Sequence, residues 1–175
     1  MRPAALLHRL LRLPILVYRW RLGWLLGHRF LLLTHAGRRT GLTHRTVLEV
    51  LRYDPASGTA VVMAGFGRQS DWYRNLRRRP ALEVAVGRRV FRPAQRELPE
   101  QEAVSVLGDY ERRNRWMAPV VRAVLSRLVG WPYDGSDAAR RRLVAERPLL
   151  AFWPATGSPA PGGTVLRSRD DVAGP

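Results

Sequence analysis

The sequence contains no cysteine, no lysine and no long uncharged hydrophobic segment. Without cysteine the chain can form no disulfide, no thiolate nucleophile and no cysteine-ligated metal site. No charge-free run approaches the ~18 residues that span a bilayer, and no apolar segment followed by a small-residue cleavage site indicates a secretory signal. We therefore expect a cytoplasmic protein, with peripheral attachment to the inner face of the cell membrane as the open alternative.

Positive charge is abundant, and all of it comes from arginine. The chain has 30 basic and 14 acidic residues, which gives a formal net charge of +16. A GC-rich genome accounts for the preference for arginine codons. Arginine nevertheless binds carboxylates and phosphates through paired hydrogen bonds that lysine cannot form. A balance this basic indicates an anionic partner: a nucleic acid, an acidic membrane surface or a polyanionic cofactor.

The ends of the chain differ in composition from its middle. Residues 1–27 predict a basic amphipathic helix, with leucines on one side and arginines on the other. Its apolar side would either cover the core or lie on an anionic membrane. Residues 155–175 are rich in proline, glycine, serine and charge, which predicts a disordered tail. Residues 28–154 are left as the folded domain.

Within this domain, short apolar or alternating segments predict strands. The predicted strands are 30–34, 43–52, 59–64, 82–86, 89–92 and 149–153. Helices are predicted over 71–79 with Ser70 as its cap, over 98–129 with a break near Pro119, and over 136–146 with Ser136 as its cap. Because hairpins link the strands, we predict an α+β fold with an antiparallel sheet or small barrel rather than a doubly wound sheet.

The turn between the first two predicted strands, written HAGRRTGLTHR, concentrates positive charge. Gly37 and Gly41 allow a tight turn that approaches a ligand closely. Its donors are the guanidinium groups of Arg38, Arg39 and Arg45 and the hydroxyl of Thr40. The spacing is not that of a P-loop, which also needs a lysine. The turn is either a site for a phosphate or polycarboxylate, or a solvated basic hairpin.

A second glycine turn follows the strand at 59–64. Gly65 and Gly67 would let a flat ring lie against bare backbone N–H groups. Asn75 could then hydrogen-bond a ring carbonyl or amide, and Trp72 could lie beside the ring. Trp72 and Leu76 are also spaced as one buried face of a helix, and we favour this core position for Trp72.

Other chemistry finds less support in the sequence. The four histidines lack metal-ligand spacing, so we predict no metal site. No GxSxG motif indicates an esterase. The arginine runs 77–79 and 140–142 are typical of solvated faces. Tyr133, in a turn between helices, is either a hydrogen-bond donor and proton source or a buried aromatic.

The two glycine turns together resemble the deazaflavin-dependent nitroreductase family. Its members typically carry GRxTG followed by an arginine, then a glycine turn and DWYxNL. Here these are residues 37–41 with Arg45, then residues 65–67 and 71–76. The resemblance extends over about residues 6–154. It implies a split antiparallel β-barrel, FMN-binding-like, with flanking helices.

The resemblance also implies an oxidoreductase that passes a hydride from reduced coenzyme F420 to an electron-poor acceptor, either a quinone or a nitro compound. In such a protein the first turn would hold the coenzyme's phosphate and acidic tail through Arg38, Arg39, Thr40, Gly41 and Arg45. The ring would lie against Met63, Ala64, Gly65, Phe66 and Gly67, with Trp72 and Asn75 beside it. Tyr133 would line the acceptor pocket, and either Tyr133 or a water molecule would deliver the proton.

Two alternatives remain open at this point. The same barrel could use FMN, FAD or haem instead of F420. A non-catalytic basic module that binds nucleic acid or an anionic membrane would explain the charge equally well, but not the two glycine turns. For the enzyme we expect a small-molecule acceptor, no nucleic acid, and a homodimer as one arrangement of the barrels.

Overall fold

The computed structural model describes residues 27–155. The predicted N-terminal helix and C-terminal tail therefore lie outside the described residues, except at Gly27 and Ala155. The strands are β1 (Phe30–Ala36), β2 (Thr43–Asp54), β3 (Thr59–Met63), β4 (Glu83–Val86), β5 (Arg89–Phe91), β6 (Pro93–Glu97) and β7 (Leu149–Pro154). The helices are α3 (Asp71–Leu76), α4 (Glu100–Arg113), α5 (Ala118–Val129) and α6 (Asp137–Glu146), with 3₁₀ turns η2 (Gly67–Gln69) and η3 (Arg115–Met117).

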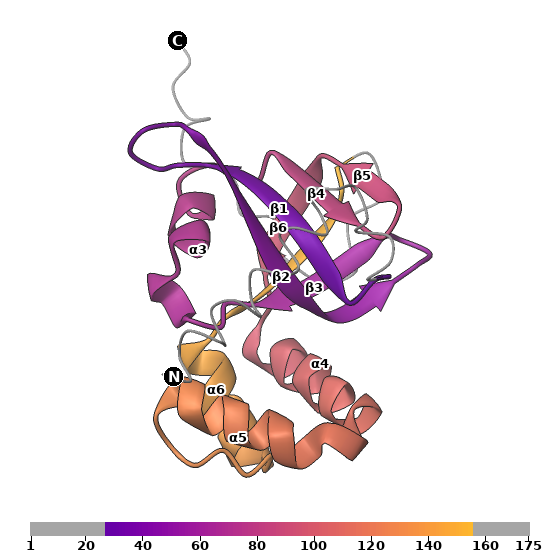
Figure 1. The fold of residues 1–175 in the computed structure, drawn as a ribbon, viewed down its shortest axis with the longest axis vertical. Coiled ribbons are helices and arrows are strands. Elements are labelled where there is room, and N and C mark those ends of the chain that lie inside the picture. Colours follow the sequence, from indigo (N-terminus) through magenta and orange to yellow (C-terminus); the bar gives the residue numbers. More distant parts are fainter. Residues whose placement is uncertain (1–26, 156–175) are drawn as a thin grey trace, which may run out of the picture.

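The seven strands form one antiparallel sheet in the order β5-β4-β1-β2-β3-β7-β6. β5 and β6 stand at opposite ends of this order, yet only Arg92 separates them along the chain. The sheet therefore curls into a nearly closed barrel, with α4, α5 and α6 gathered at one end (Figure 1). This arrangement confirms the predicted split antiparallel barrel with flanking helices.

β6 is a strand that the sequence analysis missed. Its residues, PAQRE, begin with proline and lack apolar alternation, yet Gln95 and Arg96 are buried. The Gln95 amide oxygen accepts a hydrogen bond from the Ala81 N–H, and the Arg96 guanidinium pairs with Glu102 at 2.9 Å. Partners outside the strand thus allow its polar side chains to be buried, which strand patterning does not reveal.

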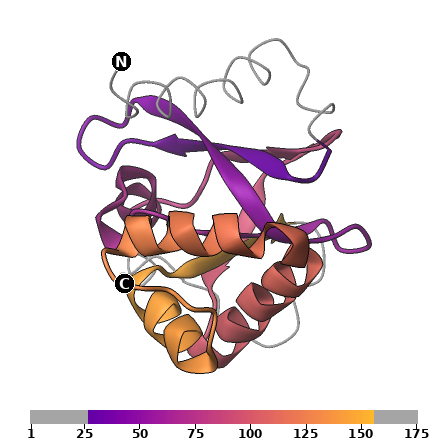
Figure 2. The same cartoon turned by 60° about the horizontal axis from the view of Figure 1, so that its bottom comes forward.

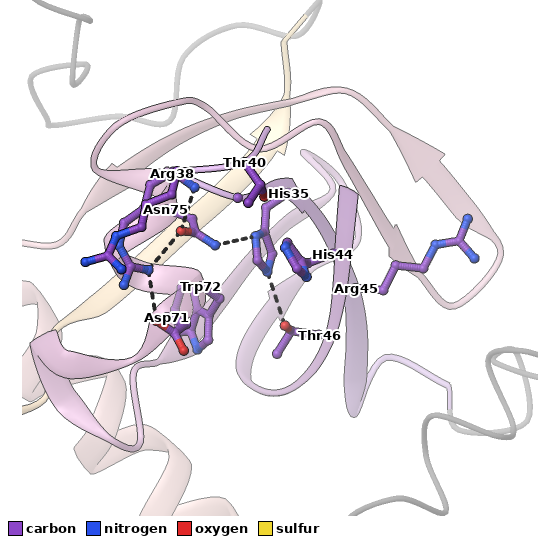
Figure 3. A pocket seen from close by; sticks show the side chains of 11 residues that line it. His35, Arg38, Thr40, His44, Arg45, Thr46, Asp71, Trp72 and Asn75 are labelled. Carbon is purple, nitrogen blue, oxygen red and sulfur yellow. Dashed lines mark hydrogen bonds and ion pairs between the residues drawn. The ribbon is translucent and has the colours of Figure 1, made fainter. Parts of the chain in front are cut away.

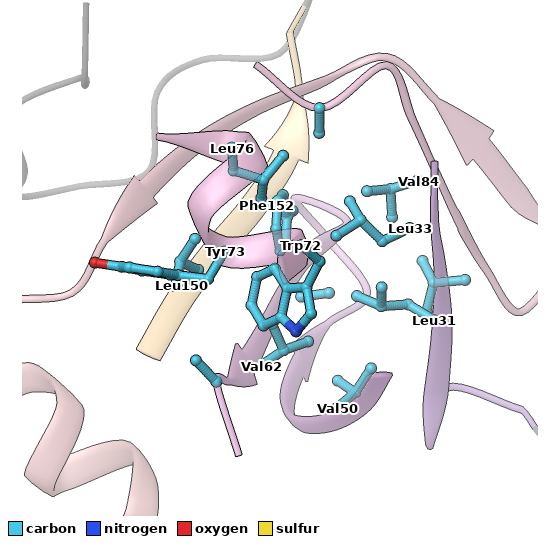
Figure 4. Packing of buried hydrophobic residues seen from close by; sticks show 14 residues of the cluster. Leu31, Leu33, Val50, Val62, Trp72, Tyr73, Leu76, Val84, Leu150 and Phe152 are labelled. Carbon is cyan, nitrogen blue, oxygen red and sulfur yellow. The ribbon is translucent and has the colours of Figure 1, made fainter. Parts of the chain in front are cut away.

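Two hydrophobic clusters lie on opposite faces of the sheet. One fills the barrel interior, where Leu31 and Leu33 of β1 meet Trp72 and Phe152 (Figure 4). The other lies between the outer face of β3 and β7 and the helices α4 and α6. β7 contributes to both, because Leu150 and Phe152 face the interior while Leu149, Ala151 and Trp153 face the helices. This explains its unbroken apolar sequence.

The observed helices agree with the predicted ones except in two details of α3, its end and its cap. The break near Pro119 is confirmed, since α4 ends at Arg113 and α5 begins with Pro119 in its first turn. Ser136 caps α6 as predicted, accepting from the Ala139 N–H at 3.2 Å. The short helix, predicted over 71–79, ends at Leu76. Ser70 precedes this helix, but its hydroxyl donates to the Gly67 carbonyl instead of capping it.

Among residues 27–155, no helix has the length and hydrophobicity required to cross a bilayer. The longest, α4, has 14 residues. Figure 2 shows α5 crossing the outside of the helical layer, in front of the barrel.

Candidate functional site

A hydrogen-bonded turn joins β1 to β2 and forms one wall of a pocket. The Gly37 N–H donates to the Leu42 carbonyl, and the Gly41 N–H donates to the Gly37 carbonyl, each at 2.8 Å. Gly41 has a φ of 70°, in the left-handed region that favours glycine. Thr40 stabilises the turn through its hydroxyl, which accepts from the Leu42 N–H at 3.3 Å. α3 forms the opposite wall.

The pocket between the hairpin and α3 has a volume of about 330 Å³. It is lined by His35, Gly37, Arg38, Arg39, Thr40, His44, Arg45, Thr46, Asp71, Trp72 and Asn75. Figure 3 shows that its polar side chains come from β1, from the turn, from β2 and from α3. The fold therefore brings the first glycine turn to α3, although Arg38 and Asp71 are 33 positions apart in the sequence. We call this space the hairpin pocket.

Arg38 is held in place by α3. Its backbone N–H donates to the Asn75 side-chain oxygen at 3.0 Å, and its guanidinium donates to the same oxygen at 3.1 Å. The guanidinium also pairs with Asp71 at 2.8 Å. The pKa of Asp71 is lowered, first by this hydrogen bond and then by the charge of Arg38. Arg38 is thus both a wall of the pocket and the link between hairpin and helix.

His35 supports Asn75 from below the pocket. It is only 2% exposed. The Asn75 side-chain nitrogen lies 3.1 Å from His35 Nδ1, and Thr46 Oγ1 lies 3.3 Å from His35 Nε2. Because the Asn75 oxygen already accepts from Arg38, its amide group donates to His35, whose Nδ1 must carry no proton. Burial, together with the neighbouring His44, lowers the pKa of His35 and favours this neutral form.

Two other arginines of the turn are available to a ligand. Within residues 27–155, neither Arg39 nor Arg45 forms an ion pair, and both are exposed. They contribute to the pocket wall, but Figure 3 shows the Arg45 side chain directed away from Arg38 and Asn75. Arg45 therefore lies at the outer rim of the pocket, while Arg38 lies inside it.

A second basic hollow adjoins the hairpin pocket. It has a volume of about 620 Å³ and is lined by Arg38, Arg39, Arg68, Tyr73, Arg74, Arg77 and Arg78. Arg38 and Arg39 belong to both spaces. Arg68 is partly neutralised, because it pairs with Glu97 at 2.9 Å while the Tyr73 hydroxyl donates to the same carboxylate. The hollow otherwise presents arginine to solvent, which suits several negative charges in a row. We call it the arginine hollow.

The predicted ring-binding turn lies apart from these spaces. None of the residues Met63 to Gly67 lines the hairpin pocket or the arginine hollow. The Ala64 N–H donates to the Pro148 carbonyl and the Gly67 N–H to the Ala64 carbonyl, so these two donors are engaged. A ring above this turn would meet the backbone of Gly65 and Phe66. The assignment of the turn to the coenzyme ring stays a prediction.

Tyr133 is placed elsewhere again. It is 3% exposed and packs among α4, α5 and α6. Its hydroxyl donates to Glu111, which also pairs with Arg140 at 2.8 Å. Burial and this carboxylate raise the pKa of Tyr133 well above its usual 10. The structure brings Trp72 and Asn75 to the turn arginines but does not bring Tyr133 to them, so its role as proton source stays a prediction without geometric support.

The sequence analysis missed the histidine beneath the site. Leu31, Leu33 and His35 occupy alternate positions of β1, and the two leucines point into the barrel. Continuing the alternation of this strand by one step places His35 on the inward face, which is the signal that could have revealed it. Its cross-strand partner is His44. Among the described residues, no group of three histidine, aspartate or glutamate side chains is placed to hold a metal ion.

Comparison with known families identifies the family to which the chain belongs. A sequence model of the F420H(2)-dependent quinone reductase family matches residues 18–123. The chain belongs to this family. The match includes both glycine turns and ends before Tyr133. It confirms the resemblance to deazaflavin-dependent enzymes and identifies the protein as an oxidoreductase of an F420-dependent family. A search of curated proteins found no match.

Solved structures with a similar fold are distant in sequence. An F420-H2 dependent reductase (FDR-A) is 18% identical, with a TM-score of 0.41 over 72% of this chain and 95% of that one. A structure described as a domain-swapped dimer is 19% identical, with a TM-score of 0.40 over 72% and 81%. A pyridoxamine 5′-phosphate oxidase-related, FMN-binding protein from Nostoc punctiforme is 17% identical, with a TM-score of 0.44 over 88% and 81%.

Proposed function

We propose that this protein transfers a hydride from reduced F420 to a quinone, with nitro compounds as secondary acceptors. The observation that carries the proposal is the meeting of Arg38, Arg39 and Arg45 at one pocket in a chain of an F420-dependent family. When bound, the reduced deazaflavin supplies the hydride, and a proton from water or a side chain completes the two-electron reduction.

The donors present fit an anionic coenzyme. Two turn arginines have no ion-pair partner among residues 27–155, and Arg38 offers the remaining edge of its guanidinium. Phosphate and carboxylate oxygens accept such donors with charge-assisted hydrogen bonds. The two spaces are adjacent, because Arg38 and Arg39 line both of them. One ligand could therefore extend across both, and we assign its phosphate to the hairpin pocket and the carboxylates of its acidic tail to the arginine hollow.

The chain's own contribution is binding and orientation. Asn75 and Asp71 fix the side chain of Arg38 before any ligand arrives, so less conformational entropy is lost on binding. His35 holds the amide of Asn75 in the orientation that Arg38 requires. Neutral imidazole therefore supports the cationic wall of the pocket.

Rapid-mixing kinetics test the reaction. Reduced F420, bound to the full chain without oxygen, is mixed with a soluble quinone or a nitroaromatic compound, and deazaflavin absorbance is followed. We expect oxidation of the coenzyme by both acceptors, with the larger kcat/KM for the quinone. Oxidation by the nitroaromatic compound alone would contradict the quinone assignment, and turnover with bound FMN but not F420 would contradict the coenzyme assignment.

The assembly state belongs to the same proposal. We propose that the protein is a homodimer, in which the contact between the two subunits covers surface that a monomer would expose to solvent. Light scattering after size-exclusion chromatography distinguishes it from the 19.9 kDa monomer.

A further inference from the structure

One face of the helical layer is apolar and exposed. Trp116 is 76% exposed, Val120 56% and Val124 59%. Val120 and Val124 are four residues apart on α5 and so lie on one side of it, and Trp116 belongs to η3, directly before this helix. Figures 1 and 2 show α5 on the outside of the molecule. We call these three residues and the surface between them the α5 face.

The opposite side of α5 is apolar as well. Leu125 is buried in the cluster beneath, and Val121 and Val129 pack against that cluster. A helix that is apolar on both sides is normally covered on both. Within residues 27–155 the α5 face has no such cover, since its three large side chains stay exposed.

A second copy of the chain, residues 1–26 or an anionic surface could cover the α5 face, and the charges around the face distinguish them. Arg115 and Arg127 stand close to the exposed apolar residues in the sequence, and no acidic residue occurs between Arg112 and Tyr133. A second copy docked through the same face would bring the same arginines against it, with no acidic residue to pair with them. Residues 1–26 carry arginines and no acid, so they are also repelled. An anionic surface with an apolar interior satisfies both the arginines and the apolar side chains.

We propose that the α5 face docks on an anionic lipid bilayer. α5 has 12 residues, a length of about 18 Å, which is shorter than a membrane-spanning helix. It would lie in the plane of the interface, with Trp116 at the boundary between headgroups and acyl chains and the arginines on lipid phosphates.

The same face adjoins the second glycine turn. A Cβ on Gly65 would lie 3.7 Å from Leu128 Cδ2, so this turn contacts the last turn of α5. Phe66, in that turn, is 71% exposed. Docking through α5 would place Phe66 beside the bilayer, where a lipid-soluble acceptor concentrates. The docking itself does not depend on the reaction proposed above.

A single engineered thiol tests the proposal, because the chain has no cysteine of its own. Val120→Cys in the full chain carries an environment-sensitive fluorophore, and Val90→Cys is the matched control. Val90 is 63% exposed on β5, which Figure 1 places away from α5. With phosphatidylglycerol vesicles we expect a blue shift at position 120 and none at position 90, and no shift with phosphatidylcholine vesicles.

Several results would overturn the inference. Vesicle binding without a shift at position 120 would locate the contact elsewhere, for example at residues 1–26. Equal shifts at positions 120 and 90 would indicate unspecific adsorption. A shift that grows with protein concentration in the absence of vesicles would make the occupant a second copy.

A second set of variants measures affinity instead of environment. We expect Trp116→Ser together with Val120→Ser and Val124→Ser to weaken sedimentation with phosphatidylglycerol vesicles by about tenfold or more, while Val90→Ser leaves it unchanged. Coenzyme affinity should be the same in both variants, which shows that the barrel is intact. Unchanged sedimentation of the triple variant would contradict the proposal.

Discussion

Replacing His35 with phenylalanine tests the polar network beneath the hairpin pocket. Phenylalanine retains the ring volume, so little cavity is created. It removes the acceptor for the Asn75 amide at 3.1 Å and the partner of Thr46 at 3.3 Å. Thr46 is half-buried and can turn to water, whereas Asn75 is 4% exposed and cannot.

The cost follows from the donor left without a partner. A buried N–H that loses its acceptor costs about 1–3 kcal/mol. In a domain of this size, the melting temperature falls by about 2–4 °C for each kcal/mol. We expect His35→Phe to lower the free energy of unfolding by about 1–3 kcal/mol. Coenzyme affinity should fall as well, because Asn75 no longer fixes Arg38.

Urea unfolding and coenzyme titration measure the two effects. His44→Phe is the matched control, since His44 faces His35 across the hairpin but is exposed. We expect His44→Phe to change stability by less than about 0.5 kcal/mol. The reasoning is refuted if His35→Phe is as stable as the wild type, or if both variants lose the same stability.

The remaining predictions concern pH, the turn arginine, a glycine and a tyrosine. Because the pKa of His35 is lowered from its usual 6.5, the unfolded chain binds more protons just below that pH. The wild type should lose stability as pH falls below 6.5, and His35→Phe should remove that part of the slope. Arg39→Gln should weaken F420 binding about tenfold to a hundredfold, the worth of one charged hydrogen bond; a change below twofold in fluorescence titration would rule out Arg39 as a ligand. Gly67→Ala should destabilise the protein by more than about 1 kcal/mol in urea, because φ is +67° and the new Cβ would lie 2.9 Å from a backbone carbonyl, whereas Gly65→Ala meets only a side chain at 3.7 Å; equal stability of the two would contradict this. Tyr133→Phe should leave turnover near that of the wild type, since the hydroxyl is bound to a carboxylate outside both pockets; a tenfold loss of kcat with unchanged coenzyme affinity would restore Tyr133 as the proton source.

The sequence predicted those parts of the fold that local patterns determine. Hairpin turns with glycine and alternating strands predicted an antiparallel sheet or small barrel, the family resemblance implied the split barrel, and Ser136 indicated the start of α6. β6 could not be found in this way, because Gln95 and Arg96 are buried through partners outside the strand, Ala81 before β4 and Glu102 in α4. The end of α3 at Leu76 depends equally on packing, since the arginines that follow favour a longer helix in isolation.

The candidate site was predictable in composition but not in geometry. The spacing of the glycines and arginines indicated an anion site, and the structure gathers Arg38, Arg39 and Asn75 around one pocket. That Asn75 orients Arg38, and that His35 orients Asn75, requires the contact between β1 and α3. A single sequence contains no measure of that contact.

The measurement that tests the central claim most directly is a titration of the full chain with F420, followed by fluorescence anisotropy, beside a deazaflavin that lacks the phosphate and acidic tail. The account predicts micromolar binding of F420 and binding at least ~100-fold weaker without the tail. Equal affinity for the two compounds, or no binding of F420, would contradict the assignment of the arginine turn as the coenzyme site.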